Sequence, residues 1–358
     1  MDITDEILKF ITQAGDSAGE RAVFEDLALE LCRRQANRVK VYGDFCRKVG
    51  VDLEKVRNVF EIPALPQAVL KYPTARDAKT EGEYVCFFET SGTSAGKRGI
   101  RPVARIDIYE KVCVTGLLRM LDREFPELFF CNGRKNSRVK EDVLLPFFFL
   151  KENTQEAPRS SLSWMFEFWR RTLGTESSAF LLEGGRVVED AILKQVMREP
   201  QQPVIVAGTA LGLLYWAEQR GRKFLLPPNS VVIETGGFKG RRREMPKSEL
   251  YRLLSEFFSL SQDRIVNEYG MTEIFSQTYA RGANGLHKSP PWLLVRIIDP
   301  FTGRVCVPGQ PGVLELLDLA NVDHVPVLQT EDLAVERSGG FELVGRASAE
   351  LRGCSLEV

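Results

Sequence analysis

The sequence is poor in histidine and has no paired cysteines, and these two features exclude whole classes of site. It contains only two histidines, His287 and His324, and its seven cysteines are dispersed without a Cys-x-x-Cys pair. Neither pattern supplies the clustered ligands of a zinc site. An odd, scattered set of cysteines also argues against a disulfide framework. It favours reduced thiols, so we expect a cytoplasmic protein.

An excess of charge of one sign is also lacking. The chain carries 48 Lys and Arg against 49 Asp and Glu, which gives a formal net charge of −1. Nucleic-acid-binding proteins typically have a clustered basic excess, so we expect no nucleic-acid partner. The one dense basic run, Arg241–Arg243, suits a solvated turn, with an anion contact as the alternative.

No apolar run approaches the roughly 20 residues that are needed to span a bilayer. The longest candidate, Val143–Leu150, has the length of a buried strand. The chain begins with Asp2, Asp5 and Glu6 among its first residues, which fits neither a secretory signal nor a transit peptide. We therefore expect no membrane span and no targeting segment.

The composition that is present describes an ordinary globular protein, with 44% hydrophobic and 27% charged residues. A chain of 358 residues is long enough for two domains, or for one large domain with an appendage. Near the N-terminus, the apolar spacing predicts helices at Asp2–Gln13 and Ser17–Val49. Ser17 and Glu20 form a possible capping box for the second helix.

Asp52 is a candidate cap for a further short helix, and three prolines then interrupt the pattern. We expect Glu61–Gly82 to be an irregular connection. Beyond it, short apolar runs alternate with helical patterns. The expected strands are Tyr84–Phe88, Val143–Leu150, Ser178–Leu182, Pro203–Val206, Val231–Glu234 and Arg264–Asn267. The expected helices are Ile108–Leu121 (capped by Asp107), Glu189–Met197, Leu211–Gln219 and Pro246–Phe258. This alternation favours an α/β fold with a mainly parallel, helix-covered sheet.

After Pro290 the pattern changes to short apolar runs separated by Gly and Pro turns. Leu293–Ile298 and Val313–Leu317 are two such runs, and they predict a small antiparallel β subdomain. We therefore divide the chain into an N-terminal helical segment packed on the core (residues 1–82), an α/β core (83–289), a β subdomain (290–344) and a short C-terminal tail (345–358).

Four polar or glycine-rich stretches follow predicted strands. They are Thr90–Gly99, Ala207–Thr209, Thr235–Gly240 and Glu268–Glu273. Ligands of parallel α/β sheets bind beyond the carboxyl ends of the strands. We therefore expect these four stretches to share one crevice.

The first of these stretches has the composition of a phosphate-binding loop. Its glycines allow tight turns and close approach of a ligand, and its hydroxyls, backbone N–H groups and positive charges suit phosphate oxygens. The spacing is not that of a Walker A loop, because only three residues separate Gly92 from Gly96 and Arg98 follows Lys97. A solvated Gly/Ser loop is the alternative. The hydroxyl residues are Thr90, Ser91, Thr93 and Ser94.

Three stretches together resemble the adenylate-forming ligases. Thr90–Gly99 resembles their phosphate loop, Asn267–Glu273 their aromatic-Gly-x-Thr-Glu motif, and Thr330–Leu333 their Thr-Gly-Asp-Leu motif. Gly345–Arg346 is similar to the Gly-Arg that follows. The ending Leu351–Leu356 resembles that of the bacterial acyl-protein synthetases, the adenylating subunits of the fatty-acid reductase complex of luminous bacteria. Further similarities are Gly236–Gly240, His287, Pro290–Trp292 and Leu319–Asn321.

The resemblance covers most of the chain from about Tyr84 and implies binding of ATP and Mg²⁺ in the α/β core. Lys97 and the loop would neutralise phosphate charge, Thr272 would lie against the α-phosphate, and Glu273 would hold the magnesium ion. His287 would belong to the catalytic group. The loop residues implied are Ser91, Gly92, Thr93, Ser94 and Gly96.

The resemblance also assigns residues to the nucleoside. Tyr269 would lie against the adenine beside Gly236 and Gly237, and Asp332 would accept two hydrogen bonds from the ribose hydroxyls. Arg346 would reach the same region. Glu268, Gly270 and Met271 complete the motif around Tyr269.

The implied activity is that of an ATP-dependent acid–thiol ligase. A carboxylic acid, in this family a fatty acid, becomes acyl-AMP, and an enzyme cysteine then takes the acyl group as a thioester. Cys354 occupies the acylated position. Arg352 nearby favours the thiolate, which is the nucleophilic form. The implied partners are an acyl reductase and an acyl donor protein.

Several structural alternatives stand beside these assignments. Glu268 and Glu273 could be a solvated pair at a helix start, where carboxylates are favoured. Asp332 could be a turn residue, and His287 a structural hydrogen-bonding residue. His324 is interpreted as structural. Cys354 could be a small buried side chain, although a position close to a chain end argues against burial.

The sequence departs from typical adenylate-forming enzymes in two ways. Those enzymes carry a further C-terminal domain whose lysine assists adenylation, and here we expect none after Gly345–Arg346, as in the acyl-protein synthetases. Glu331 also stands where a glycine is usual. Two other functions stay open: an acyl-CoA ligase of the phenylacetate type, and a non-catalytic nucleotide-binding scaffold of a reductase complex.

The aromatic residues leave the acyl pocket undefined, because aromatic strands and helix faces are more often plain core. The candidates are Phe129, Phe130, Phe147, Phe148, Phe149, Trp164, Phe166, Phe168 and Trp169.

Overall fold

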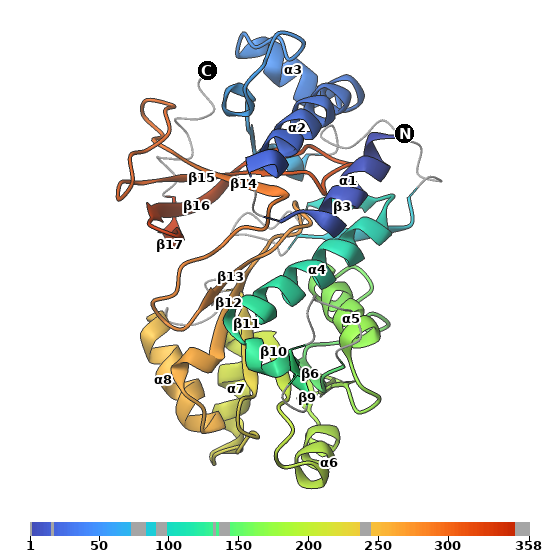
Figure 1. Ribbon diagram of the computed structural model, residues 1–358, viewed down its shortest axis with the longest axis vertical. Helices are drawn as coiled ribbons and strands as arrows, with labels where there is room; N and C mark the ends of the chain where they lie inside the picture. The colour runs from blue at the N-terminus through green and yellow to red at the C-terminus, as the bar shows by residue number, and fades with distance from the viewer. Residues whose placement is uncertain are drawn as a thin grey trace. The chain divides into compact units, whose positions relative to one another are not determined.

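The computed structural model describes residues 2–15, 18–72, 84–90, 99–131, 134–135, 144–236 and 245–347. The chain forms two compact units (Figure 1). The terminal unit consists of Met1–Val112, Met271–Ser276 and Leu286–Val358, and the inner unit of Cys113–Gly270 and Gln277–Gly285. The helices are α1 (Ile3–Gln13), α2 (Ala18–Arg38), α3 (Lys40–Lys48), α4 (Ile106–Glu124), α5 (Ser161–Leu173), α6 (Asp190–Arg198), α7 (Ala210–Arg220) and α8 (Lys247–Phe258).

The inner unit is built on a six-stranded sheet in the order β13-β12-β11-β10-β6-β7. All neighbouring strands are parallel except β12 and β13. This confirms the predicted mainly parallel sheet and adds an antiparallel edge strand. The strands are β6 (Phe147–Leu150), β7 (Ala179–Phe180), β10 (Ile205–Thr209), β11 (Val231–Thr235), β12 (Ile265–Tyr269) and β13 (Thr278–Arg281).

Helices cover both faces of this sheet because alternate side chains of each strand point to opposite faces. Phe148 belongs to a core with Leu213 of α7 and Leu254 of α8, and Figure 1 shows these two helices side by side. Phe149 points to the other face and stacks on Phe166 of α5, with the ring centroids 4.9 Å apart. Trp164 on α5 is only half-buried, whereas six other aromatic candidates on β6 and α5 are packed in the core and at most 1% exposed. These six are Phe147, Phe148, Phe149, Phe166, Phe168 and Trp169.

The terminal unit contains a second sheet in the order β1-β16-β15-β14, with β17 paired to β16. The pairs among β14, β15, β16 and β17 are antiparallel, which confirms the predicted β subdomain. The strand β1 instead runs parallel to β16, so that Leu65 lies opposite Leu328. The strands are β1 (Leu65–Pro66), β14 (Leu293–Ile298), β15 (Pro311–Asp318), β16 (Val327–Arg337) and β17 (Gly340–Arg346).

The region predicted as an irregular connection, Glu61–Gly82, contains β1 and the short 3-10 helix η2 (Gln67–Lys71). The prediction was wrong for these residues because a two-residue strand has no alternation that a sequence pattern can show. Residues 73–83 lie outside the described part. The same pairing explains why residues from both ends of the chain form one unit, a grouping that differs from the four consecutive segments predicted from the sequence.

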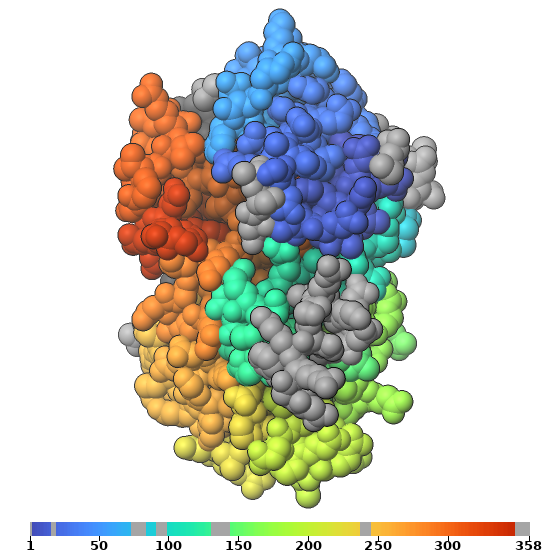
Figure 2. Space-filling model, viewed as in Figure 1, coloured from blue at the N-terminus to red at the C-terminus, as the bar shows by residue number. Residues whose placement is uncertain are grey.

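Three helices precede β1, and Figure 2 shows their surface in blue. The predicted single helix Ser17–Val49 is two helices, because Val39 is extended between α2 and α3. The two helices approach closely there: a Cβ on Gly43 would lie 2.3 Å from the Ala36 carbonyl oxygen. Glu20 accepts a hydrogen bond from the Gly15 N–H group, while its predicted capping partner Ser17 lies outside the described residues.

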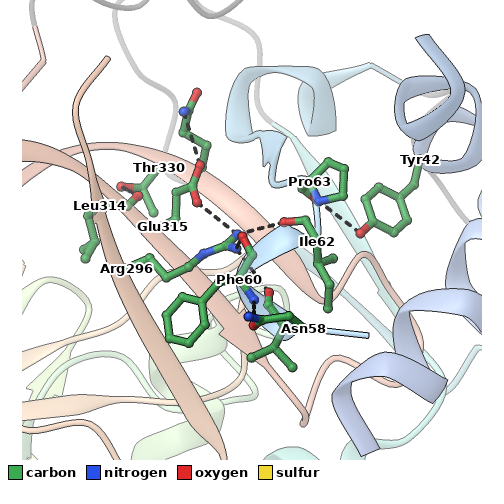
Figure 3. A network of polar contacts seen from close by, with 11 residues as sticks. Tyr42, Asn58, Phe60, Ile62, Pro63, Arg296, Leu314, Glu315 and Thr330 are labelled. Carbon is green, nitrogen blue, oxygen red and sulfur yellow. Dashed lines mark hydrogen bonds and ion pairs between the residues drawn. The ribbon is translucent and has the colours of Figure 1, made fainter. Parts of the chain in front are cut away.

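A buried arginine ties the segment before β1 to the sheet (Figure 3). Arg296 is 4% exposed and donates to the carbonyl oxygens of Val59, Phe60 and Ile62 at 3.0–3.2 Å. Its guanidinium also lies 2.9 Å from Oε2 of Glu315. Burial raises the pKa of Glu315, and the Arg296 charge opposes that shift. The charge is therefore paired and hydrogen-bonded, as burial of an ion requires.

The strands β2 (Cys86–Glu89) and β3 (Ile100–Val103) form a separate antiparallel hairpin in the terminal unit. The hairpin continues by one step, because Thr90 N–H donates to Gly99 O at 2.9 Å. Gly99 N–H donates back to the Thr90 hydroxyl at 2.8 Å. The two ends of the predicted phosphate loop are therefore fixed to each other.

Some local predictions were wrong. Asp107 lies inside the first turn of α4 and pairs with Arg105, so it does not cap the helix. Asp52 accepts from Glu54 N–H in a turn that does not become a helix. The helix α5 was not predicted, although its buried residues Met165, Phe166, Trp169 and Leu173 recur at helical spacing. Smaller elements are β4 (Phe130–Cys131), β5 (Arg134–Lys135), β8 (Leu182–Glu183), β9 (Arg186–Val187), η1 (Val59–Glu61), η5 (Pro126–Phe129) and η6 (Gln262–Arg264).

Within the described ranges, none of the helices combines the length and apolar character that a membrane crossing needs.

Candidate functional site

Many of the predicted site residues belong to the described part of the chain, and the others stay predictions. The residues outside it are Ser91, Gly92, Thr93, Ser94, Gly96, Lys97, Gly237 and Cys354.

Described residues from three of the four polar stretches lie at the carboxyl ends of neighbouring strands of the inner-unit sheet. The register places Thr209 at the end of β10 opposite Thr235 at the end of β11, and Thr235 opposite Glu268 of β12. The register therefore brings these strand ends together, and the shared crevice stays a prediction. The stretch Thr90–Gly99 follows β2, which is a strand of a separate hairpin, so the prediction that it follows a strand of the same sheet was wrong.

Glu268 is buried at this edge, with 3% of its surface exposed. Its carboxylate accepts a hydrogen bond from the Thr235 hydroxyl. Burial raises the pKa of Glu268 to about 7, and the hydrogen bond from Thr235 opposes the rise. Glu268 is a strand residue in a dry environment, so the alternative of a solvated carboxylate at a helix start was wrong for it.

A second buried carboxyl group, Glu234 on β11, lies near Glu268. It accepts a hydrogen bond from the Tyr251 hydroxyl at 3.0 Å. Burial raises the pKa of Glu234 to about 7, Lys247 lowers it, and the Glu268 charge raises it further. Sequence reasoning missed Glu234, although a lone acid in the apolar run Val231–Thr235 is a usable signal for a partnered buried group.

Two glycines of the predicted nucleotide site are required by the backbone here. A Cβ on Gly270 would lie 2.6 Å from Oε1 of Glu268, so a side chain would collide with that carboxylate. Gly236 has a φ of +68°, a conformation that side-chain-bearing residues rarely adopt. Tyr269, the residue implied to lie against adenine, is half-buried and lies opposite Thr278 of β13.

The motif continues into the terminal unit, where Thr272 and Glu273 are held by their backbone carbonyls. Arg101 on β3 donates to Thr272 O at 3.0 Å, and Asn321 donates to Glu273 O at 3.0 Å. Arg101 also donates to Oδ1 of Asn321 at 2.9 Å, which joins the two supports. The backbone of this dipeptide is therefore fixed by side chains from two distant segments.

Arg101 is 2% exposed, and its guanidinium lies 3.6 Å from the centroid of the Phe275 ring. Burial lowers its pKa to about 10, and the charges of Asp323 and Asp318 oppose that shift. The side chain therefore stays cationic at neutral pH. Sequence reasoning missed Arg101, yet a lone basic residue in the strand Ile100–Val103 indicates a buried partner.

Asp318 holds the next part of the same segment. Its carboxylate accepts hydrogen bonds from the N–H groups of Phe275 and Ser276 and from the Ser276 hydroxyl, at 2.7–3.0 Å. Trp292 Nε1 donates to the same hydroxyl at 3.0 Å. Burial raises the pKa of Asp318, and the Ser276 hydrogen bonds lower it. Trp292 and Asn321, which belong to the two sequence motifs, therefore contact the same short segment as Asp318, residues 273–276.

Glu273 is 6% exposed, and its Oε1 accepts a hydrogen bond from Gln67 Nε2 at 2.9 Å. The chain does not form a helix at this point, so the alternative of a solvated glutamate at a helix start was also wrong here. Met271 begins the same turn, with its carbonyl accepting from Ile274 N–H.

Asp332 and Arg346 are brought together by β16 and β17. They are opposite each other in the ladder, and Arg346 Nε lies 3.4 Å from Oδ1 of Asp332. The alternative of Asp332 as a turn residue was wrong, because it lies inside an 11-residue strand. Glu331 is also a strand residue, a conformation that does not require the glycine usual in the motif. The assignment of Asp332 to the ribose hydroxyls stays a prediction.

Comparison with known proteins gives a consistent result. Residues 194–358 match the family model described as "Acyl-protein synthetase, LuxE". Over these residues the chain is similar to the acyl-protein synthetases. It is 24% identical over 334 residues to the long-chain-fatty-acid–luciferin-component ligase of Vibrio harveyi, covering 88% of this chain and 82% of that protein. The ligase of the same name from Aliivibrio fischeri is 19% identical over 93% of this chain and 84% of its own length.

Solved structures show the fold. An open conformation of 2-hydroxyisobutyryl-CoA ligase, in complex with 2-HIB-AMP and CoA, aligns with a TM-score of 0.61 and 15% identity over 92% of this chain and 76% of that one. The same ligase in its thioesterification state gives 0.63 and 13% over 93% and 70%. The predicted adenylate-forming fold is confirmed by these similarities.

The acyl-protein synthetase resemblance implies Mg²⁺, and the terminal unit offers a compatible donor. The described residues contain no group of three acidic, histidine or cysteine side chains that could enclose an ion. Magnesium bound with a nucleotide typically uses one or two carboxylates plus phosphate oxygens and water. Glu273, an oxygen donor whose backbone and side chain are both held, fits that mode.

His287 is buried, with 2% of its surface exposed. Its backbone exchanges two hydrogen bonds with Phe341, and its ring stacks on the Phe341 ring at 5.3 Å. These contacts account for a structural role, and the catalytic role implied by the acyl-protein synthetases stays a prediction. His324 is 4% exposed, and burial lowers its pKa to about 3, so its ring is neutral, in keeping with the structural interpretation.

Proposed function

We propose that this protein activates a carboxylic acid, a long-chain fatty acid, as acyl-AMP and then transfers the acyl group to its own cysteine. The family match over residues 194–358 carries the proposal, because it includes Glu268–Glu273, Asp332, Arg346 and Cys354. The name of the Vibrio harveyi relative supports a long-chain fatty acid as the substrate. The acyl-AMP named in the solved neighbours supports the intermediate.

In the first step, a carboxylate oxygen attacks the α-phosphorus of ATP, and the bond from that phosphorus to the bridging oxygen breaks. Pyrophosphate leaves with the bonding electrons. A magnesium ion held by Glu273 would neutralise phosphate charge. Thr272, whose carbonyl is fixed by Arg101, would present its hydroxyl or N–H group to the α-phosphate. Asp332 would accept hydrogen bonds from the two ribose hydroxyls.

In the second step, the thiolate of Cys354 attacks the acyl carbonyl carbon, and the bond to the phosphate oxygen of AMP breaks. AMP leaves, and the acyl group remains as a thioester. An acyl reductase partner would then accept the group, with an acyl donor protein as the source of the acid. We place these reactions in the cytoplasm, because reduced thiols are typical of that compartment and five cysteines are free in the structure: Cys32, Cys46, Cys86, Cys113 and Cys306.

The first test is ATP–pyrophosphate exchange with purified full-length protein and carboxylic acids of increasing chain length. We expect exchange that depends on the acid, with a maximum among long-chain acids. Binding of ATP without exchange for any acid would contradict the proposal and favour the nucleotide-binding scaffold.

The second test is acylation of the protein by a labelled acid in the presence of ATP. We expect a hydroxylamine-labile label that falls to background in Cys354→Ser while exchange persists. Cys86→Ser is the matched control, because burial raises the pKa of the Cys86 thiol to about 11 and makes it a poor nucleophile. A label retained by Cys354→Ser would contradict the assigned acceptor. Efficient acyl-CoA formation by that variant would favour the CoA ligase.

A further inference from the structure

Gln67 lies between two of the motifs assigned to nucleotide binding. It is the first residue of η2 and directly follows β1, whose parallel pairing with β16 places Pro66 opposite Gln329. This pairing places Gln67 beside Glu331, which lies 264 residues further along the chain and directly precedes Asp332. No sequence motif indicated this residue.

Both ends of the Gln67 amide are used. Its Nε2 donates to Oε1 of Glu273 at 2.9 Å, and its Oε1 accepts from the Glu331 N–H group at 3.3 Å. The chemistry fixes this orientation, because a carboxylate oxygen accepts and a backbone N–H donates. Rotating the amide by 180° would place two acceptors together and two donors together.

Gln67 hydrogen-bonds the Glu273 carboxylate, and the charge of the buried Arg101 also acts on it. Asn321 and Arg101 hold the backbone carbonyls of Glu273 and Thr272, and neither interaction orients the Glu273 carboxylate. Gln67 uses one carboxylate oxygen, and the other oxygen, Oε2, accepts no hydrogen bond from the described residues. One oxygen is thus anchored while the second remains for a cation.

We propose that Gln67 is a positioning residue for magnesium-bound nucleotide. It orients the Glu273 carboxylate and ties it to the strand that carries Asp332, so that the metal donor and the ribose acceptor keep one spacing. This inference rests on the proposed function, because that function assigns Glu273 and Asp332 to Mg²⁺ and ribose. Partners that orient a metal-binding carboxylate typically change metal affinity by about 10–100-fold when they are removed.

The test uses Gln67→Met, which keeps the length of the side chain and removes both hydrogen bonds. Binding of a non-hydrolysable ATP analogue is measured by calorimetry at increasing Mg²⁺ concentration. We expect the half-saturating Mg²⁺ concentration to rise by about 10-fold or more. Binding of the analogue without Mg²⁺ should change much less.

Gln329→Met is the matched control. Gln329 also donates from its amide to a carboxylate, Oε1 of Glu315 at 3.4 Å, in the same sheet. Its Mg²⁺ dependence should stay that of the parent protein. If Gln67→Met does not fold, Gln67→Asn replaces it, because an amide shorter by one methylene cannot reach both partners.

The outcomes separate this inference from the function on which it rests. If a folded Gln67 variant shows the Mg²⁺ dependence of the parent, the positioning role is overturned. Acid-dependent exchange by the parent protein would still support the proposed function. An equal shift in Gln329→Met also overturns the positioning role, because the effect would then be general to the sheet. A parent protein that binds the analogue without any effect of Mg²⁺ overturns the inference, and absence of acid-dependent exchange separately overturns the function.

Discussion

Glu234 and Glu268 are two buried carboxyl groups on neighbouring strands, and each has a pKa raised by burial to about 7 from an ordinary 4.5. The groups that face Glu234 are Lys247, Tyr251, Asn267 and Glu268. In the folded protein both acids therefore hold protons at pH values where the unfolded chain has released them. Such groups stabilise the fold most below about pH 4.5, and this contribution is lost as the pH rises to about 7.

This linkage predicts the effect of Glu234→Gln, which mimics the neutral acid. The parent should lose stability between pH 5 and pH 8 through this pair, and the variant should lose about 1–3 kcal/mol less over the same range. Urea unfolding at several pH values measures the difference. Glu183→Gln, at an exposed carboxyl of the same unit, should leave the parent profile unchanged. A Glu234→Gln profile parallel to the parent's would contradict the prediction.

At two motif residues the structure agrees with the grouping predicted from the sequence, while their roles at the nucleotide stay predictions. Asp332 and Arg346 were assigned to one region, and the structure pairs them across two strands. The roles of Arg101 and Gln67 were not predicted, because each depends on hydrogen bonds to residues more than 150 positions away in the sequence. A lone polar residue in an apolar strand indicates a buried side chain, but the sequence does not show which residue it contacts.

At the scale of single elements, two helices of the inner unit end in the same way with different residues. Gly221 ends α7 with a φ of +64°, and Ser259 ends α8 with a φ of +54°. In each case the capping N–H group bonds a carbonyl four residues earlier. Only glycine adopts this left-handed conformation without a steric penalty. Ser259 therefore carries strain that Gly221 does not.

Ser259→Gly should raise the free energy of unfolding by about 0.5–1 kcal/mol, since relief of strain exceeds the greater entropy that glycine gives the unfolded chain. Chemical denaturation measures it. Gly221→Ala is the reciprocal control and should lower the free energy of unfolding by about 1 kcal/mol. Equal stability of Ser259→Gly and the parent would show that the serine cap is unstrained.

Elements with strong periodicity were predictable, and their ends less so. The predicted helix Glu189–Met197 differs from α6 by one residue at each end. The break at Val39 was missed, and so was the two-residue strand β1, which forms only by pairing with the distant strand β16. The predicted strand Tyr84–Phe88 was assigned to the parallel sheet, whereas β2 pairs with β3, a strand that was not predicted.

At the scale of the whole molecule, Arg296 joins regions that are far apart in sequence. It binds three carbonyl oxygens of residues 59–62 and the carboxylate of Glu315 from a buried position. Removing one partner of a buried pair leaves an uncompensated charge, and this typically costs about 3–5 kcal/mol. Truncation of this one side chain should therefore weaken the hold of the sheet on the segment before β1.

We expect Arg296→Met to lower the free energy of unfolding by about 3–5 kcal/mol and to speed hydrogen exchange at the amides of Glu61 and Ile62. Urea unfolding and exchange mass spectrometry measure the two effects. Arg337→Met removes an exposed pair with Glu342 and should cost less than about 1 kcal/mol. Unchanged exchange at residues 59–62 would show that the segment is held without Arg296.

Composition and alternation were enough to predict the α/β class and the C-terminal antiparallel sheet. They did not predict that segments from both ends form one unit, because β1 contributes only two residues to its pairing. The pairing of β1 with β16 decides which segments form one unit. It is a long-range contact, and the local sequence around β1 gives almost no indication of it.

The parallel pairing of β1 with β16 also has a consequence on the ribosome. Leu65 meets its neighbour only after Leu328 has been translated, which takes tens of seconds at about 5–20 residues per second. The residues of the inner unit have all been made before then. Nascent chains should therefore acquire the central six-stranded sheet first, while the earliest-made helices wait for a partner strand and depend on chaperones to shield their apolar faces.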